Sequence, residues 1–212
     1  MYDVRPNIII GFHGCDKSLR DKLVNSPDEM EYSKKPYDWL GHGMYFWENN
    51  YSRAQIWAEE KMKDGSIKNP SVIGAVIHLG YCCDFLDSKY IQVIKDYHSS
   101  LNELYKIIGE ELPKNRNSKG DPNKDMVLRE LDCAVIEYMH QSIFENWKSE
   151  INDSKTSSIK NFDTTRGVFT EGGPAFIGAG LFEKSHIQIC VRNPNSIKGF
   201  FIPRNEVPFP KV

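Results

Sequence analysis

The sequence predicts an α+β fold with strand-rich ends around a helical middle. Two observations indicate this class: apolar runs of strand type lie near both ends of the chain, and apolar residues at helical spacing fill its centre. The chain has 212 residues, which suits one domain with a well-formed core. We therefore expect a single domain that spans residues 1–212.

The N-terminal part alternates between strand and helix patterns. Asn7 to Phe12 is a continuous apolar run of the kind found in buried strands, and Ser18 to Asn25 predicts a short helix. Asn50 is a good helix cap, and apolar residues after it repeat at helical spacing as far as Lys63. Val72 to Leu79 predicts a second buried strand.

The middle and the C-terminal part follow a different pattern. Two amphipathic helices are expected on either side of a polar segment at residues 113–124. The glycine-rich stretch from Arg166 to Gly180 predicts a loop. Two strand patterns follow, His186 to Val191 and Ile197 to Ile202, separated by an Asn-Pro-Asn turn, and we expect them to pair as a C-terminal hairpin.

Composition narrows the function classes. The net charge of −2 provides no overall attraction for nucleic acid, so such a partner would need a local basic patch. No apolar run approaches the ~20 residues of a spanning helix, and the N-terminus lacks a signal-peptide pattern. The five cysteines have no metal-ligand spacing. We expect a cytoplasmic protein with reduced thiols, no membrane partner and no metal.

Two short glycine-containing segments carry the chemical signal. The first, GFHGC at residues 11–15, places a His-Gly pair after the first apolar run. The second, GHGMYFW at residues 41–47, places an aromatic run after two glycines, about thirty residues downstream. Each feature has an ordinary structural explanation, since a histidine after a strand often makes a structural hydrogen bond and an aromatic strand often faces a core.

Together, the two segments resemble the first two signatures of the His-Tyr-Glu class of ADP-ribosyltransferases, the class of the poly(ADP-ribose) polymerases and diphtheria toxin. The match covers about fifty residues, from His13 to the helix that contains Ser52, Arg53 and Ala54. The resemblance implies a split, mostly antiparallel β-sheet around an NAD cleft. Residues 90–160 do not match and are expected to be a helical insertion.

The resemblance also implies roles for individual residues. Breaking the bond between nicotinamide and ribose builds positive charge on the ribose, so a site must orient the sugar and stabilise that charge. By position, His13 would bond the ribose hydroxyls, the backbone of Gly14 would bond the nicotinamide amide, and Tyr45 would stack on the nicotinamide ring. NAD is the expected co-substrate, and Gly43 would leave room beside its nicotinamide.

Two further contacts to NAD are expected. A second stacking aromatic usually comes from the helix after the tyrosine strand, and Trp57 is the aromatic residue there, beside the aligned Ile56. Arg166 is expected to contact the pyrophosphate, because a guanidinium forms paired hydrogen bonds with phosphate oxygens.

The third signature departs from the family pattern. The family glutamate lies near the start of a late strand, and the corresponding strand from His186 to Val191 holds no acid. The glutamate position falls on His186 or Gln188, depending on a two-residue gap. We place Gln188 first for ribose binding and Glu183 second, with Glu171 as a further rival acid. A glutamine bonds a hydroxyl without charge, which costs about 1–2 kcal/mol relative to a carboxylate. Within the family, such a change accompanies transfer of a single ADP-ribose.

The sequence thus predicts an NAD-dependent mono-ADP-ribosyltransferase acting on a macromolecule, either a nucleic acid or a protein. The apolar loop before residue 186 would dock that target. A small transferase of this kind would suit a bacterial toxin or an anti-phage effector, held in check by an antitoxin or immunity partner. The alternative is a catalytically inactive relative that binds NAD, ADP-ribose or a partner protein on the same scaffold.

Overall fold

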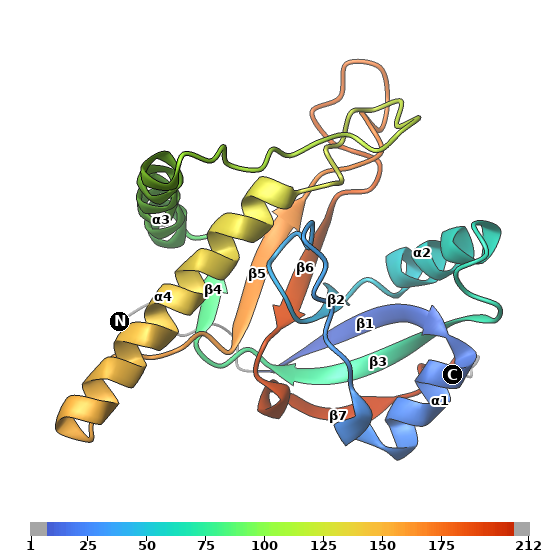
Figure 1. The fold of residues 1–212 in the computed structure, drawn as a ribbon. Helices are drawn as coiled ribbons and strands as arrows, with labels where there is room; N and C mark the ends of the chain where they lie inside the picture. The colour runs from blue at the N-terminus through green and yellow to red at the C-terminus, as the bar shows by residue number, and fades with distance from the viewer. Residues whose placement is uncertain (1–7, 206–212) are drawn as a thin grey trace.

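The computed structural model describes residues 8–205 and confirms the α+β class. Its seven strands form one mostly antiparallel sheet with the order β4-β5-β6-β2-β1-β3-β7 (Figure 1). The strands are β1 Ile8–Asp16, β2 Met44–Glu48, β3 Pro70–His78, β4 Cys82–Asp84, β5 Thr164–Phe169, β6 His186–Val191 and β7 Ile197–Phe201. The helices are α1 Lys17–Asn25, α2 Tyr51–Lys63, α3 Ser88–Ile108 and α4 Glu130–Ser154, with short 3₁₀ turns at Pro27–Glu29 and Pro194–Ser196.

Strand β1 is longer than the sequence indicated. It continues through the His-Gly pair to Asp16, because it pairs antiparallel with β3 over nine residues, from Ile8 opposite His78 to Asp16 opposite Pro70. The Asp16 carboxylate then caps α1 by accepting a hydrogen bond from the backbone N–H of Ser18. Asn7, the first residue of the predicted strand, lies outside the described residues.

The sheet opens between β1 and β2. These strands share only two register pairs, Gly11 with Glu48 and Phe12 with Trp47. Strand β2 then continues alongside β6, whereas β1 continues alongside β3. Figure 1 shows the result as two groups of strands that run in different directions, β4-β5-β6 and β1-β3-β7. The sheet is therefore split, as expected.

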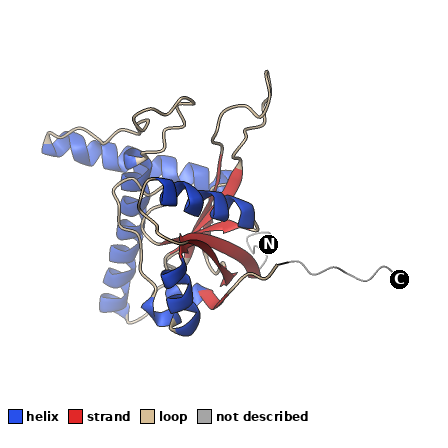
Figure 2. Ribbon diagram, turned by 90° about the vertical axis from the view of Figure 1, so that its right-hand side faces the viewer, coloured by secondary structure: helices blue, strands red, loops and turns tan. Residues whose placement is uncertain are grey.

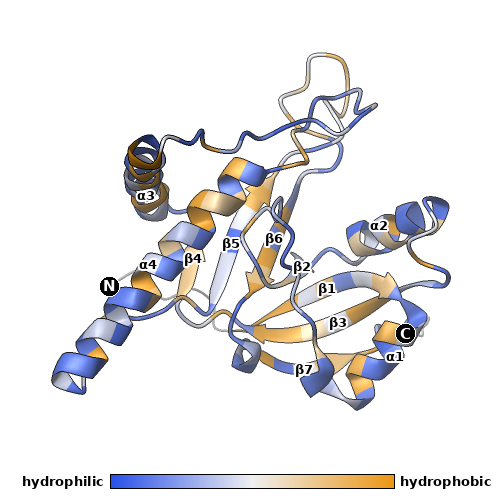
Figure 3. Cartoon of the chain, in the orientation of Figure 1, coloured by the Kyte–Doolittle hydropathy of each residue, from blue (hydrophilic) through white to orange (hydrophobic). Residues whose placement is uncertain are grey.

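The two faces of the sheet are covered differently. One face packs against α1 through Leu23, which joins a core that includes Phe46, Ile73 and Ile189. The other face packs against α2, where Ala54 lies with Trp47 in a separate apolar cluster. Alternation along β2 explains the division, because neighbouring strand residues point to opposite faces. Figure 3 shows that the strands are mainly hydrophobic and that polar residues are spread along the helices.

The two predicted middle helices are confirmed. Helix α3 is capped by Asp87 and ends at Gly109, which has a φ of 76°. It packs against α4 over a core that includes Tyr90, Met139 and Phe162. A cavity of about 600 Å³ lies between α3, α4 and β5. Both helices lie between β4 and β5 in the chain, within the segment predicted as an insertion.

Two sequence-based expectations about the C-terminal part are wrong. Residues 166–169 belong to β5, although a glycine-rich loop was expected from Arg166 onward. The buried Thr164, whose hydroxyl donates to the carbonyl of Leu79 at 2.6 Å, begins this strand. Strands β6 and β7 do not form a hairpin: β6 pairs with β2 and β5, and β7 pairs with β3 at the far edge.

Two long loops extend from the same end of the molecule, one after α3 and one between β5 and β6 (Figure 2). They are joined by a hydrogen bond of 2.9 Å from the backbone N–H of Gly172 to the carboxylate of Asp125. Within residues 8–205, no helix combines the length and the apolar character needed to cross a bilayer. All five cysteines are buried.

Candidate functional site

His13 lies where the sheet opens. Its Nδ1 donates a hydrogen bond to the carbonyl of Tyr45 at 2.8 Å, which links β1 to β2 beyond their last register pair. Burial lowers the pKa of His13, so the imidazole is neutral and its Nε2 carries a lone pair. The ring centroid is 6.0 Å from that of Phe46 and 6.5 Å from that of Trp57. Its register partner on β3, Ile73, belongs to the core on the α1 side, so the His13 side chain leaves β1 on the face opposite to that of Trp47 and Gln188.

Tyr45 is held at both its backbone and its hydroxyl. The hydroxyl accepts a hydrogen bond from the backbone N–H of Leu40 at 2.8 Å and donates to the carbonyl of Gly41 at 2.6 Å. Burial raises the pKa of the phenol, which keeps it neutral. The ring packs against a small core formed by Leu40, Phe169 and Cys190. In this structure Tyr45 is therefore also a core residue.

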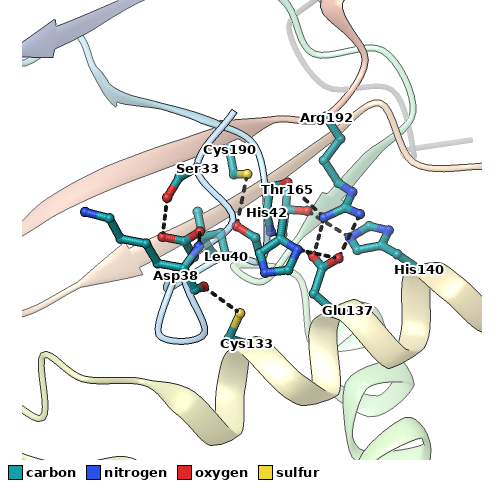
Figure 4. Close-up of polar contacts among 12 residues, drawn as sticks. Ser33, Asp38, Leu40, His42, Cys133, Glu137, His140, Thr165, Cys190 and Arg192 are labelled. Atoms are coloured by element: carbon teal, nitrogen blue, oxygen red, sulfur yellow. Dashed lines mark hydrogen bonds and ion pairs between the residues drawn. The ribbon is translucent and has the colours of Figure 1, made fainter. Parts of the chain in front are cut away.

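The segment before Tyr45 is attached to helix α4, as Figure 4 shows. Glu137 on α4 accepts a hydrogen bond from the backbone N–H of His42 at 2.8 Å and pairs with both terminal nitrogens of Arg192. Gly41 has a φ of 78°, and a Cβ there would lie 2.5 Å from a Glu137 oxygen. The glycine therefore permits a close contact between the segment and the helix.

The two glycines assigned to the nicotinamide, Gly14 and Gly43, are packed closely against protein atoms. A Cβ at Gly14 would lie 2.3 Å from the carbonyl oxygen of Ala54, so this glycine lets α2 lie directly on β1. A Cβ at Gly43 would lie 2.5 Å from the sulfur of Cys190 on β6. The half-buried Trp57 packs on the same α2 side as Gly14.

Arg166 makes internal ion pairs. Its guanidinium bonds both oxygens of Glu48, at 2.6 and 3.0 Å, and one oxygen of Asp84 at 3.0 Å. The two carboxylates raise the pKa of Arg166. The N–H groups of its guanidinium are thereby bonded to Glu48 on β2 and to Asp84 on β4. The three side chains tie together strands that lie on either side of β5 and β6 in the sheet, which is a structural role.

The two candidates for the third signature have different surroundings. Gln188 on β6 lies opposite Trp47 on β2 and is only 9% exposed. Directly opposed residues share a face, so Gln188 lies on the α2 side with Trp47. Tyr45 precedes Trp47 by two residues on β2, so its side chain points to the same face. Glu183 is exposed in the loop before β6. The structure thus brings Gln188, and not Glu183, onto the sheet face of Tyr45.

A group of buried polar side chains on this face was not assembled by the sequence analysis. We call Trp47, Arg53, Glu171 and His186 the polar cluster. Arg53 from α2 places its Nη2 3.4 Å from the Glu171 carboxylate, and its guanidinium carbon lies 5.6 Å from the ring centroid of Trp47. His186 Nδ1 is 3.6 Å from the same carboxylate oxygen. The exposed fraction is between 5 and 9% for each member.

The polar cluster has more hydrogen-bonding capacity than the protein uses. In the described part of the chain, six buried side-chain nitrogen or oxygen atoms have no hydrogen-bond partner, and four of them are Arg53 Nε and Nη1, Trp47 Nε1 and His186 Nε2. Burial lowers the pKa of His186 to about 4, so the ring is neutral; its Nδ1 donates to the carbonyl of Lys184, which leaves Nε2 as an acceptor. Buried polar atoms normally have partners, so these four make the polar cluster a candidate binding site.

The sequence contained one signal for this cluster. Arg53 falls on the inner face of α2 beside Ala54, where an arginine needs a buried partner. That partner, Glu171, is 118 residues away, and only the fold brings the two together. No group of three or more potential metal ligands occurs among residues 8–205.

Comparisons with known proteins show one relative and assign no activity. The chain is 27% identical over 203 residues to the "Uncharacterized protein MJ0359" of Methanocaldococcus jannaschii, an alignment that covers 88% of this chain and 83% of the relative. No protein-family model matches the sequence. No solved structure matches the fold at a significant level.

Proposed function

We propose that this protein is an NAD-dependent mono-ADP-ribosyltransferase that transfers one ADP-ribose to a macromolecule. The observation that carries the proposal is the arrangement of the three signature positions. His13, Tyr45 and Gln188 lie on β1, β2 and β6, which are consecutive neighbours in the sheet. The His13 ring bonds the backbone of Tyr45 at 2.8 Å where the sheet opens, and Gln188 shares the face of Tyr45.

The reaction makes few demands on the protein beyond orientation and charge stabilisation. The bond between C1′ of the ribose and the nicotinamide nitrogen breaks, and its electron pair leaves with nicotinamide, which becomes neutral. Positive charge develops on C1′ and the ring oxygen, as in glycoside cleavage. A nucleophile of the target bonds to C1′ and releases its proton to solvent. No metal is required for these steps.

The properties of His13 suit the ribose. A neutral imidazole whose Nδ1 is already bonded offers Nε2 as an acceptor for a sugar hydroxyl. The half-buried Trp57, whose ring centroid lies 6.5 Å from that of His13, supplies an aromatic surface for a ring to stack on. The proposed NAD cleft is the region between His13, Trp57 and the polar cluster.

The macromolecular target is a nucleic acid or a protein. Lys119 and Lys124 lie in the loop after α3, beside the loop that contains the exposed side chains of Phe176 and Ile177. Exposed aromatic and basic groups together suit docking of a macromolecule. A transferase of this size would act in the cytoplasm, as a bacterial toxin or anti-phage effector that an antitoxin or immunity partner restrains.

A catalytically inactive relative that binds NAD, ADP-ribose or a partner protein is the second candidate. Two observations favour it. Position 188 holds a neutral side chain, and the Tyr45 ring is packed in a core with its hydroxyl bonded to the backbone at Leu40 and Gly41. Stacking of nicotinamide on Tyr45 would require that core to open.

Labelled NAD separates the two candidates. The purified protein is incubated with cell lysate and NAD labelled in its adenylate phosphate, and the products are digested separately with protease and with nuclease. We expect nicotinamide release together with label on a macromolecule. Label that resists protease and is lost with nuclease identifies a nucleic-acid target, and the opposite pattern identifies a protein.

Purified protein that binds NAD in calorimetry, with neither nicotinamide release nor label, would establish the inactive relative. Protein that neither binds nor cleaves NAD would contradict both candidates. His78, a half-buried histidine on β3, provides the matched control, because His78→Ala removes a strand histidine away from the opening of the sheet.

A further inference from the structure

We propose that Glu171 supplies the carboxylate that the late strand lacks, by accepting a hydrogen bond from the nicotinamide ribose and facing the charge that develops on it. The inference rests on the proposed transferase function and names the acidic residue of that site. Its basis is the geometry of the polar cluster, in which Glu171 is the acidic member, beside the strand that carries Gln188.

Glu171 lies just beyond the end of β5, next to the start of β6. Phe169 pairs with His186, and the carbonyl of Glu171 accepts a hydrogen bond from the backbone N–H of Lys184 at 2.8 Å. The carboxylate is directed toward α2, where it lies 3.4 Å from Nη2 of Arg53. It reaches the α2 side of the sheet from the neighbouring strand, which is the side that Gln188 and Trp47 share.

The contacts of Glu171 differ from those of a structural ion pair. Glu48, which does hold the sheet together, bonds Arg166 with both oxygens at 2.6 and 3.0 Å. Glu171 has one long contact to Arg53, and its Oε1 is 3.6 Å from a His186 nitrogen that already donates to Lys184. Hydrogen bonds weaken toward 3.5 Å, so this carboxylate retains capacity to accept stronger bonds.

The neighbouring unpartnered atoms fit a sugar better than an ion. Arg53 and Trp47 offer free N–H donors, and His186 Nε2 offers a lone pair. A hydroxyl-rich ligand both donates and accepts, so it satisfies donors and acceptors together. A ribose that bonds Glu171 would therefore also give these buried, unpaired atoms hydrogen-bond partners.

Catalysis needs the ionised form of Glu171. As the C1′–nitrogen bond breaks, the carboxylate keeps its hydrogen bond to the ribose hydroxyl and lies near the positive charge, with no net proton transfer to the protein. Preorganised charge in a site shielded from water typically contributes about 100–1,000-fold in rate. The other rival acid, Glu183, is exposed in the same loop and has no place in the polar cluster.

The test compares Glu171→Gln with Glu145→Gln, a matched substitution of an exposed glutamate on α4. Each variant is assayed for nicotinamide release and for NAD binding by calorimetry. We expect Glu171→Gln to lower kcat about 100-fold or more, with NAD affinity within about threefold of the unmodified protein. Glu145→Gln should keep full activity. Glu171→Asp, which retains the charge, should recover part of the loss.

A double variant tests whether Glu171 replaces the strand acid. Adding Gln188→Glu to Glu171→Gln should restore part of the activity, because position 188 lies on the same face. The pH profile provides a readout that a structural role would not alter. Burial raises the pKa of Glu171, so activity should fall on the acid side at higher pH than for an ordinary glutamate, and Glu171→Gln should abolish that limb. The charged or titratable groups around this carboxylate are Arg53, Arg129, Lys184, His186 and Asp125.

The outcomes separate the two proposals. If the unmodified protein cleaves NAD and Glu171→Gln cleaves it within about threefold of the same rate, the role of Glu171 is wrong and the transferase function stands. If the unmodified protein does not cleave NAD under any condition tested, the proposed function is wrong, and the role of Glu171 is wrong with it.

Discussion

His13 and Tyr45 are joined by a hydrogen bond from the histidine Nδ1 to the tyrosine carbonyl, at 2.8 Å across the opening of the sheet. The bond leaves the histidine Nε2 as the nitrogen available to a ligand. It also places the two signature residues at a fixed distance in the absence of any substrate. The histidine is therefore oriented by the fold itself.

His13→Ala should abolish activity while leaving most of the fold intact. The variant removes a group that is already oriented for the ribose, and loss of one such group typically lowers kcat by about 100–1,000-fold. Nicotinamide release under saturating NAD measures the effect, and circular dichroism checks the fold. His78→Ala should retain the activity of the unmodified protein. Equal losses in the two variants would show that His13 has no special role.

Glu137→Ala should loosen the segment that precedes Tyr45. The carboxylate bonds Arg192 and the backbone N–H of His42, so its removal leaves a partly buried guanidinium without its partner. We expect a loss of about 1.5–3 kcal/mol in the free energy of unfolding, measured by urea titration. Glu145→Ala, on the exposed side of the same helix, should cost less than about 0.5 kcal/mol. A similar small loss at position 137 would contradict the anchoring role.

Arg166→Lys distinguishes a structural role for this arginine, as the centre of internal ion pairs, from a contact to the pyrophosphate of NAD. Lysine retains the charge but cannot form the paired hydrogen bonds to Glu48 and the bond to Asp84 at the same time. We expect reduced thermal stability and a KM for NAD that changes by less than about threefold. A KM that rises about tenfold or more with unchanged stability would instead establish the pyrophosphate contact that the sequence suggested.

Acid should destabilise the protein through its buried histidines. Burial lowers the pKa of His140 to about 3 and that of His186 to about 4, below the ordinary value of 6.5. The unfolded chain therefore binds protons that the folded chain excludes. Stability is complete above pH 6.5 and falls between that pH and about pH 3–4, by up to about 1.4 kcal/mol per pH unit for each histidine.

Urea titrations at several pH values measure this dependence. His140→Gln should reduce the pH dependence of the free energy of unfolding between pH 6 and pH 4.5, although it lowers stability at neutral pH. His98→Gln, at an exposed position on α3, should leave the slope unchanged. An unchanged slope in His140→Gln would show that His140 does not account for the acid sensitivity.

The sequence predicted the elements that local pattern determines. Strand β6 was predicted with its observed bounds, and the Asn50 cap was confirmed by the hydrogen bond that its side chain accepts from Arg53. Strand β5 was missed because its neighbouring glycines suggested a loop, whereas pairing with both β4 and β6 decides the conformation. The hairpin was wrong because two adjacent strand patterns do not specify whether they pair with each other.

The candidate site shows the same division. The sequence singled out His13 and Tyr45 from short motifs and Gln188 from its place in the late strand, and these assignments stay predictions. The polar cluster was not found from the sequence. Arg53 and Glu171 come together only because α2 packs on the sheet and because the loop after β5 returns toward that helix. Contacts between residues 118 positions apart depend on tertiary structure and leave no local pattern.

The hydrogen bond between Asp125 and the backbone of Gly172 makes the position of Glu171 depend on the middle of the chain. Gly172 directly follows the proposed carboxylate, and Asp125 lies in the polar segment between α3 and α4. The segment that least resembles known transferases therefore contacts the residue next to the one proposed to replace their glutamate. Deleting that segment would remove the bond that Gly172 donates and leave Glu171 held by the backbone bond from Lys184.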